Sequence, residues 1–130
     1  MVGESFLEKG NDLDKTDLNI LIVDDDQSIA RTFSRILQKK GYQTDTASTG
    51  REAIQKTASK CFDVALIDVC LPDMNGMELV NKLSDHGRKM VKIVITGFPT
   101  MTTENAHPDA YLLKPVNPQE LLSVINQKTR

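Results

Sequence analysis

Two short apolar runs in the chain end directly in aspartate. Residues 20–23 are followed by three consecutive aspartates at 24–26, and residues 64–67 are followed by Asp68. Short continuous apolar runs that stop at turn residues are typical of buried strands in a parallel sheet. An acid is costly in the middle of such a strand, but at its carboxyl end it can open into a crevice. We therefore expect the two runs to share one acidic pocket.

The rest of the chain alternates between strand and helix patterns. A helical apolar face follows the first aspartates, and Gly41 stands where that helix should stop. Ser48 or Thr49 can cap the next helix, and Asn117 followed by Pro118 begins the last one. The expected strands are residues 19–23, 42–47, 64–68, 91–95 and 110–113.

This alternation predicts an α/β fold, a doubly wound five-stranded parallel sheet with helices on both faces. In the flavodoxin-like strand order 2-1-3-4-5, the winding reverses between the first and third strands, and ligands bind at that point. That order places Asp24, Asp25 and Asp68 side by side. We expect residues 1–18 to form a mobile leader and residues 19–130 to form the domain.

One segment between the fourth and fifth strands departs from the alternation. Pro99 and Pro108 bracket a run rich in threonine and asparagine, which are mediocre helix formers. The two prolines limit any helix there to about two turns. We therefore expect a short helix or an irregular loop over residues 98–109.

The composition argues against several classes of protein. The 130 residues suit one domain, and a net charge of -2 gives no basic surface for nucleic acid. No apolar run approaches the roughly 18 residues that a membrane helix needs. Cys61 and Cys70 lack the spacing of a metal site, and nothing suggests export. A reduced, cytoplasmic protein is therefore expected.

The predicted acidic pocket favours a particular chemistry. Three neighbouring carboxylates repel one another unless a proton or a cation joins them, and hard oxygen ligands favour Mg²⁺ or Mn²⁺. Aspartate can also accept a phosphoryl group covalently. Thr96 and Lys114, at the ends of the fourth and fifth strands, can neutralise charge on phosphoryl oxygens. The pattern therefore indicates phosphoryl transfer to an aspartate beside a divalent ion.

The same residues carry a resemblance to a known family. From about residue 19 to residue 128 the chain resembles the receiver domains of two-component response regulators. The resemblance implies a phosphorylated switch that catalyses only its own phosphoryl acceptance and slow hydrolysis, so it is not an enzyme with a separate substrate. The motifs that carry it are Ile20-Leu-Ile-Val-Asp-Asp-Asp26, Asp63-Val-Ala-Leu-Ile-Asp-Val-Cys-Leu-Pro-Asp-Met-Asn-Gly76, Ile93-Val-Ile-Thr96 and Tyr111-Leu-Leu-Lys-Pro115.

The resemblance implies a phosphoacceptor and a set of metal ligands. Asp68 would take the phosphoryl group from a sensor histidine kinase or a phosphotransfer protein. Asp25 and Asp68 would ligate Mg²⁺ directly, together with the backbone carbonyl of Cys70. Asp24 would bind the ion mainly through water, and Asp26 is left outside the metal ligands.

The resemblance also implies a switch at the ends of the last two strands. Lys114 would pair with the phosphoryl group, and the Lys114–Pro115 peptide would be cis. Thr96 would move to a phosphoryl oxygen, and Tyr111 would turn inward behind it. The added charge would then change the binding of a downstream protein, which the sequence does not name.

The interval from Thr96 to Lys114 departs from the family pattern. It is 18 positions here, and the family usually has about one helical turn more. The fourth helix should therefore be shortened or missing. Because that helix contributes to the output and dimer face in many relatives, we expect a monomer or a weak dimer.

Two other functions fit parts of the pattern. A receiver-like interaction module would keep the fold without phosphorylation, and the altered fourth segment is consistent with it. Asp24, Asp26 and Ser28 also match the nucleophile pattern of haloacid-dehalogenase-like phosphohydrolases. Those enzymes need a further acidic pair after the lysine. After Lys114 the only acid is Glu120, which is assigned to a helix cap.

Overall fold

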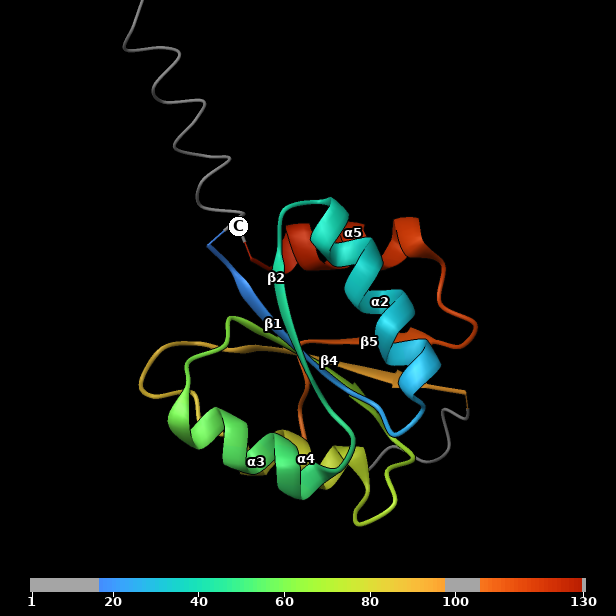
Figure 1. The fold of residues 1–130 in the computed structure, drawn as a ribbon. Helices are drawn as coiled ribbons and strands as arrows, with labels where there is room; N and C mark the ends of the chain where they lie inside the picture. Colours follow the sequence, from blue (N-terminus) through green and yellow to red (C-terminus); the bar gives the residue numbers. More distant parts are fainter. Residues whose placement is uncertain (1–16, 98–105, 130) are drawn as a thin grey trace, which may run out of the picture.

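A computed structural model describes residues 17–97 and 106–129 of the chain. In these parts, five strands form one parallel sheet in the order β2-β1-β3-β4-β5, with four helices around it (Figure 1). This confirms the predicted fold class and strand order. The strands are β1 (Asn19–Val23), β2 (Gln43–Ala47), β3 (Val64–Asp68), β4 (Val91–Thr96) and β5 (Ala110–Leu113). The helices are α2 (Gln27–Lys39), α3 (Gly50–Ser59), α4 (Gly76–Lys82) and α5 (Pro118–Lys128).

Helices cover both faces of the sheet, so its central strands are buried on two sides. Helices α2 and α5 lie on one face, and α3 and α4 lie on the other (Figure 1). Strand β1 sends Ile20 and Ile22 into the core beneath α2 and α5, and Leu21 and Val23 into the opposite core. Each such side chain stabilises the fold by about 1.5–3 kcal/mol. This double burial explains why the strands read as continuous apolar runs.

Local signals in the sequence set the ends of the helices. The Asp26 carboxylate caps α2 by accepting hydrogen bonds from two backbone N–H groups of the first turn. Gly41 follows that helix with a φ of 95°, a conformation that glycine adopts without steric cost. Thr49 caps α3 and Asn117 caps α5. The caps at Thr49 and Asn117 and the stop at Gly41 confirm the expectations from the sequence, whereas the cap at Asp26 was not predicted.

Two strand boundaries differ from the expected ones by a single residue. The expected second strand begins at Tyr42, but β2 begins at Gln43 because the Tyr42 N–H bonds to the Leu37 carbonyl at the end of α2. The Tyr42 ring is buried in the core beneath α2 and α5. The fourth strand runs one residue further than expected and includes Thr96.

The two segments with the weakest patterns fall largely outside the described residues. The expected short helix or loop is described only at residues 106–109, which contain no helix, and the rest of it cannot be compared. Most of the expected leader also lies outside, except that Leu18 packs against the core and its carbonyl accepts from Gln43 N. At the described end of the loop, Asp109 and Lys92 exchange two hydrogen bonds that fix the start of β5.

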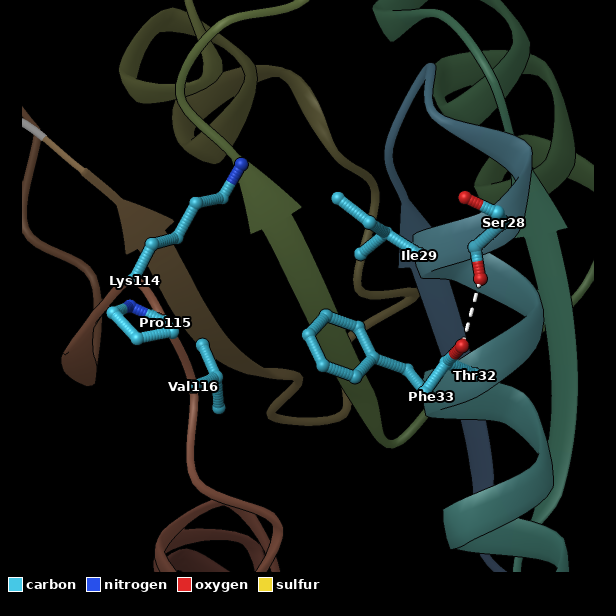
Figure 2. Close-up of a pocket in the computed structure, with 7 residues that line it drawn as sticks. All are labelled: Ser28, Ile29, Thr32, Phe33, Lys114, Pro115 and Val116. Atoms are coloured by element: carbon cyan, nitrogen blue, oxygen red, sulfur yellow. Dashed lines mark hydrogen bonds between the residues drawn. The ribbon is translucent and has the colours of Figure 1, made fainter.

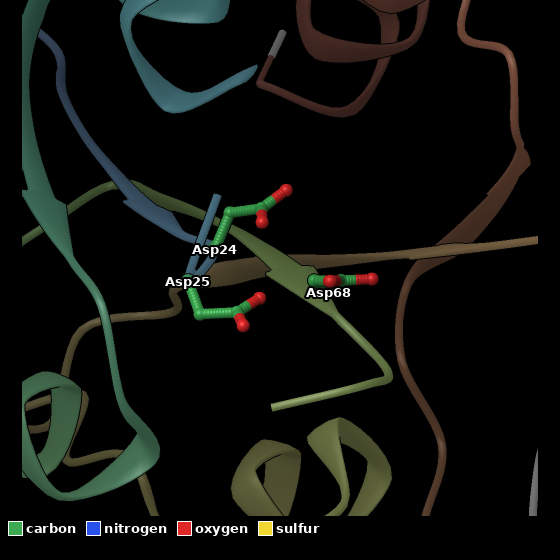
Figure 3. A group of neighbouring side chains, drawn as sticks. All are labelled: Asp24, Asp25 and Asp68. Atoms are coloured by element: carbon green, nitrogen blue, oxygen red, sulfur yellow. The ribbon is translucent and has the colours of Figure 1, made fainter. Parts of the chain in front are cut away.

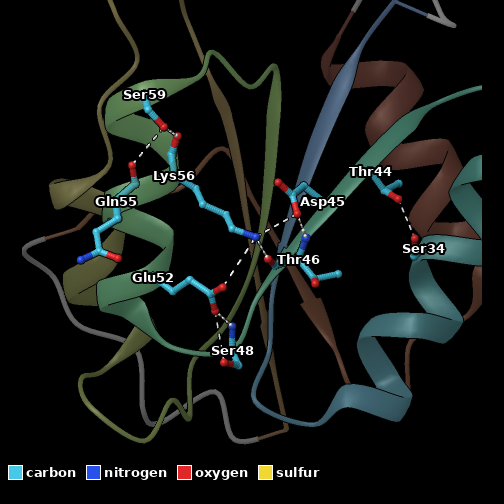
Figure 4. Close-up of polar contacts among 9 residues, drawn as sticks. All are labelled: Ser34, Thr44, Asp45, Thr46, Ser48, Glu52, Gln55, Lys56 and Ser59. Carbon is cyan, nitrogen blue, oxygen red and sulfur yellow. Dashed lines mark hydrogen bonds and ion pairs between the residues drawn. The ribbon is translucent and has the colours of Figure 1, made fainter.

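A polar network joins the edge strand β2 to α3 (Figure 4). Lys56 Nζ lies 2.9 Å from Asp45 Oδ1, 3.6 Å from Glu52 Oε2 and 2.6 Å from the Thr46 carbonyl. Glu52 Oε1 in turn accepts a hydrogen bond from Ser48 N at 2.7 Å. Charged side chains along an edge strand also discourage pairing with other chains. The network therefore orients α3 and protects one edge of the sheet.

The network makes part of the stability dependent on pH. The bond from Ser48 N lowers the pKa of Glu52 below its ordinary value of 4.5. The folded state therefore gains stability from Glu52 above that value and loses it as the pH falls through the lower folded pKa. We expect Glu52→Gln to lower the free energy of unfolding at neutral pH, and the difference from wild type to shrink as the pH falls below 4.5. Urea unfolding at neutral pH and at a series of acidic pH values measures this.

The control for this prediction is Glu78→Gln, on the exposed side of α4. This variant should lower the free energy of unfolding at neutral pH by less than Glu52→Gln, because the Glu78 side chain is exposed. A Glu52→Gln deficit of equal size at neutral and acidic pH would contradict the prediction.

Gly76, at the start of α4, allows the chain to pass close to the end of β3. Its N–H donates to the Val69 carbonyl at 2.8 Å, and a Cβ at this position would lie 2.2 Å from the backbone oxygen of Asp68. We expect Gly76→Ala to destabilise the protein by about 3 kcal/mol, because backbone atoms cannot move aside cheaply. Gly50→Ala is the matched control, since its Cβ would meet the flexible end of Met74. Equal melting temperatures of Gly76→Ala and wild type would refute this.

Candidate functional site

Three carboxylates meet at the carboxyl edge of the sheet. Asp24 and Asp25 directly follow β1, and Asp68 is the last residue of β3, the strand next to β1. Their ligand atoms lie within 4.8 Å of one another (Figure 3). The structure thus brings together the three aspartates that the sequence placed in one pocket.

Two of these carboxylates are buried. Asp24 is 5% exposed and Asp68 is 6% exposed, whereas Asp25 is exposed to solvent. Burial raises the pKa of Asp24, a hydrogen bond from Asp26 N opposes that shift, and the negative charge of Asp68 adds to it. The pocket is therefore an unfavourable place for negative charge unless a cation compensates it.

Lys114 supplies one positive charge from the end of β5. Its Nζ lies 3.1 Å from Oδ1 of Asp68. Burial alone would lower the pKa of Lys114, but the hydrogen bond to Asp68 and the nearby negative charge hold that pKa above its ordinary value. The Lys114–Pro115 peptide is cis, and Lys114 N donates to the Thr96 carbonyl. The lysine side chain is therefore held as a cation beside Asp68.

The two expected switch residues lie in different environments. Thr96 ends β4 and is 3% exposed. Tyr111, on the edge strand β5, is 47% exposed, and Leu113 on the same side of that strand is exposed as well. The structure thus places Thr96 at the same edge of the sheet as Asp68, and Tyr111 at the surface of the neighbouring strand.

A tight loop follows Asp68 and carries Cys70. The Val69 carbonyl accepts hydrogen bonds from both Leu71 N and Gly76 N, and Cys70 forms an isolated bridge with Asn75. The loop therefore returns on itself directly beyond the strand, which keeps the Cys70 backbone near the acidic pocket.

An apolar groove borders the site, and sequence reasoning did not identify it (Figure 2). It has a volume of about 510 Å³ and lies between α2 and the segment after β5. The sequence placed Ile29 and Phe33 on the inner face of a helix, but nothing in it showed that Val116 would lie opposite them. The lining residues are Ser28, Ile29, Thr32, Phe33, Lys114, Pro115 and Val116.

The residues at the pocket fit a hard divalent cation. Carboxylate oxygens and a backbone carbonyl are ligands that Mg²⁺ prefers, and a cation there would offset the repulsion between the buried acids. Asp26, which lies next to the pocket in sequence, uses its carboxylate to cap α2. The carboxylates that could hold such an ion are those of Asp24, Asp25 and Asp68, and the backbone carbonyl of Cys70 is a further oxygen in the loop that follows Asp68.

Within residues 17–97 and 106–129, no helix has the length and apolar character that a bilayer-spanning segment requires.

Comparison with known proteins gives consistent matches. A family model described as the response regulator receiver domain matches residues 20–126. The response regulator MprA of Mycolicibacterium vanbaalenii is 34% identical over 110 residues, which cover 82% of this chain and 48% of that protein. The response regulator ArlR of Staphylococcus epidermidis is 30% identical over 116 residues, covering 86% and 52%. The chain spans about half the length of the curated relatives it matches.

Solved structures match over a larger share of their length. A CheY-like response regulator receiver domain protein from Methanospirillum hungatei superposes with a TM-score of 0.79 and 40% identity, covering 86% of this chain and 93% of that chain. The response regulator TrrA from Thermotoga maritima, solved in complex with Mg²⁺ and BeF, gives a TM-score of 0.76 and 28% identity, covering 85% and 97%. The family match, the strand order and the position of the aspartates agree: this chain belongs to the response regulator receiver domain family.

Proposed function

We propose that this chain accepts a phosphoryl group on Asp68 from a histidine kinase or a phosphotransfer protein, and that the added group switches the binding of a downstream protein. The observation that supports it most directly is Lys114 Nζ at 3.1 Å from Asp68 Oδ1, inside a cluster of three carboxylates. A buried aspartate with a purely structural role would not require both a lysine and two further carboxylates beside it. Receiver domains act as regulators in the relatives that match, which is consistent with this role.

The chemistry follows from the charges around Asp68. One carboxylate oxygen attacks the phosphorus of a phosphohistidine, so that an O–P bond forms as the P–N bond breaks and the imidazole leaves. Lys114 is placed to neutralise a phosphoryl oxygen in the transition state. Bound Mg²⁺ would supply further positive charge at the pocket. Asp25, Asp68 and the Cys70 carbonyl would hold it directly and Asp24 mainly through water, and the Mg²⁺–BeF complex of the similar protein TrrA is consistent with a bound magnesium ion.

Phosphorylation would act as a switch through the ends of β4 and β5. The Thr96 hydroxyl would bond to a phosphoryl oxygen, and Tyr111 would leave its exposed position and turn inward. A phosphoryl group adds charge and strong acceptor oxygens, which can bias an element between two positions. The exposed surface of β5 would then differ between the two states, and the downstream protein would distinguish them.

The structure weighs against the phosphohydrolase alternative. In that reading the acid two positions after the nucleophile Asp24 would take part in catalysis. That acid is Asp26, and its carboxylate is already bonded to Ser28 N, Ser28 Oγ and Ile29 N at the start of α2. The other alternative, an interaction module that is never phosphorylated, would have the same fold and would differ only in that Asp68 accepts no phosphoryl group. A phosphorylation experiment therefore separates it from our proposal.

Incubation with acetyl phosphate and Mg²⁺ tests the proposed function. We expect wild type to gain the mass of one phosphoryl group in an adduct that is stable in acid and labile in base. Asp68→Asn should abolish it, because an amide oxygen is a poor nucleophile, and Asp45→Asn, on β2, should leave it intact. Intact-mass spectrometry measures the adduct. Labelling of Asp68→Asn, or no adduct on wild type, would rule out the proposal.

The apolar groove next to Lys114 suggests where the phosphodonor sits. A donor must bring its phosphohistidine to Asp68, and the groove between Ile29 and Val116 offers apolar surface beside that path. We expect Ile29→Ala and Val116→Ala to slow transfer from a phosphorylated histidine kinase about tenfold, the effect of roughly 1.4 kcal/mol of lost binding. Labelling by acetyl phosphate should not change. Radiolabel transfer measured over time gives both rates.

Val124→Ala is the control for the groove, because it removes a partly buried side chain of α5 that does not line the groove. Equal slowing by all three variants would indicate a loss of stability and would contradict the assignment of the groove.

A further inference from the structure

The loop between β3 and α4 is anchored at its tip by Asp73. Oδ1 of Asp73 accepts a hydrogen bond from Gly50 N, and Oδ2 accepts one from Arg51 N, each at 2.9 Å. Both donors belong to the first turn of α3, 22 and 23 residues earlier in the chain. One side chain therefore bonds the segment after the phosphoacceptor strand to a different helix.

The start of α3 needs this carboxylate. The first N–H groups of a helix have no partner within it. Thr49 Oγ1 accepts from Glu52 N at 3.0 Å, and Asp73 accepts from the two N–H groups before it. The hydrogen bond from Gly50 N is the largest cause that lowers the pKa of Asp73, and the bond from Arg51 N is the second largest. A charged acceptor at a helix N-terminus also interacts favourably with the helix dipole, so this anchor is charge-assisted.

Packing reinforces the anchor. Met74, the next residue of the loop, covers Gly50 so closely that a Cβ there would lie 2.5 Å from the methionine sulfur. Hydrogen bonds at Asp73 and contact at Met74 thus hold the same end of α3. The loop tip therefore contacts the start of α3 through two neighbouring residues, of which Asp73 makes the directional bonds.

The other end of the loop is the metal pocket. Asp68 ends β3, and the loop returns through bonds from Leu71 N and Gly76 N to the Val69 carbonyl. Cys70 lies within that turn, between Val69 and Leu71, and three residues before Asp73. Its carbonyl position is therefore determined by the strand on one side and by α3 on the other.

We propose that Asp73 is a positioning residue that holds the Cys70 backbone carbonyl in place for a divalent cation at Asp24, Asp25 and Asp68. This inference rests on the proposed function, since it assumes that the pocket binds the ion used in phosphoryl transfer. Partners that orient metal ligands commonly affect affinity about 10- to 100-fold.

Metal titration of Asp73 variants tests the inference. We expect Asp73→Ala to weaken Mn²⁺ binding about tenfold, read as free Mn²⁺ by electron paramagnetic resonance. The Mg²⁺ concentration for half-maximal labelling by acetyl phosphate should rise by the same factor, and the rate at saturating Mg²⁺ should stay near wild type. Asp73→Asn keeps one acceptor oxygen but loses the charge, so its Mn²⁺ affinity should lie between those of Asp73→Ala and wild type. If the alanine variant does not fold, the asparagine variant provides the test.

Thr49→Val is the matched control, because it removes the other side-chain acceptor at the start of α3 and leaves the loop untouched. It should lower the melting temperature and leave Mn²⁺ affinity unchanged. Two results would overturn this inference and leave the proposed function standing. One is equal Mn²⁺ affinity of the Asp73 variants and wild type, and the other is a loss of Mn²⁺ affinity in Thr49→Val as large as that in Asp73→Ala. Failure of wild type to bind Mn²⁺ or to be labelled would instead count against the proposed function.

Discussion

The close approach of two buried carboxylates is the constraint on which the site depends. Asp24 and Asp68 lie at the edge of an apolar sheet, where their negative charges repel each other and are poorly solvated. Lys114 compensates part of that charge at 3.1 Å. A pocket with this residual negative charge favours binding of a cation, and positive charge at this point is what the proposed phosphoryl transfer requires.

The parallel sheet converts this local chemistry into a shared site. Every strand ends at the same edge, so residues far apart in the chain converge there, and the long Lys114 side chain reaches Asp68 from beyond β4. Gly76 contributes because its lack of a side chain lets the chain turn sharply beyond Asp68. The loop that results lies against α3, which is itself joined to β2 through Lys56. The surroundings of Asp68 therefore extend through this loop and α3 to β2 at the edge of the sheet.

Much of this arrangement was predictable from the sequence, because it is encoded in local patterns. The apolar runs of β1 and β3, the cap at Asn117 and the stop at Gly41 each depend on neighbouring residues only. The contact of Asp73 with α3 was not predictable in this way, since it depends on how two crossovers pack against the sheet. The groove facing Val116 was missed for the same reason. Tyr42 was assigned to a strand because strand propensity does not reveal its bond to α2.

The sheet also separates two cores that share no side chains. The groove belongs to the layer of α2 and α5, whereas the anchored loop belongs to the layer of α3 and α4. Because distant substitutions without shared contacts act nearly additively, changes at Ile29 or Val116 leave the opposite layer largely unaffected. If the groove binds the donor as proposed, its side chains can diversify during evolution while the loop anchored on α3 is preserved.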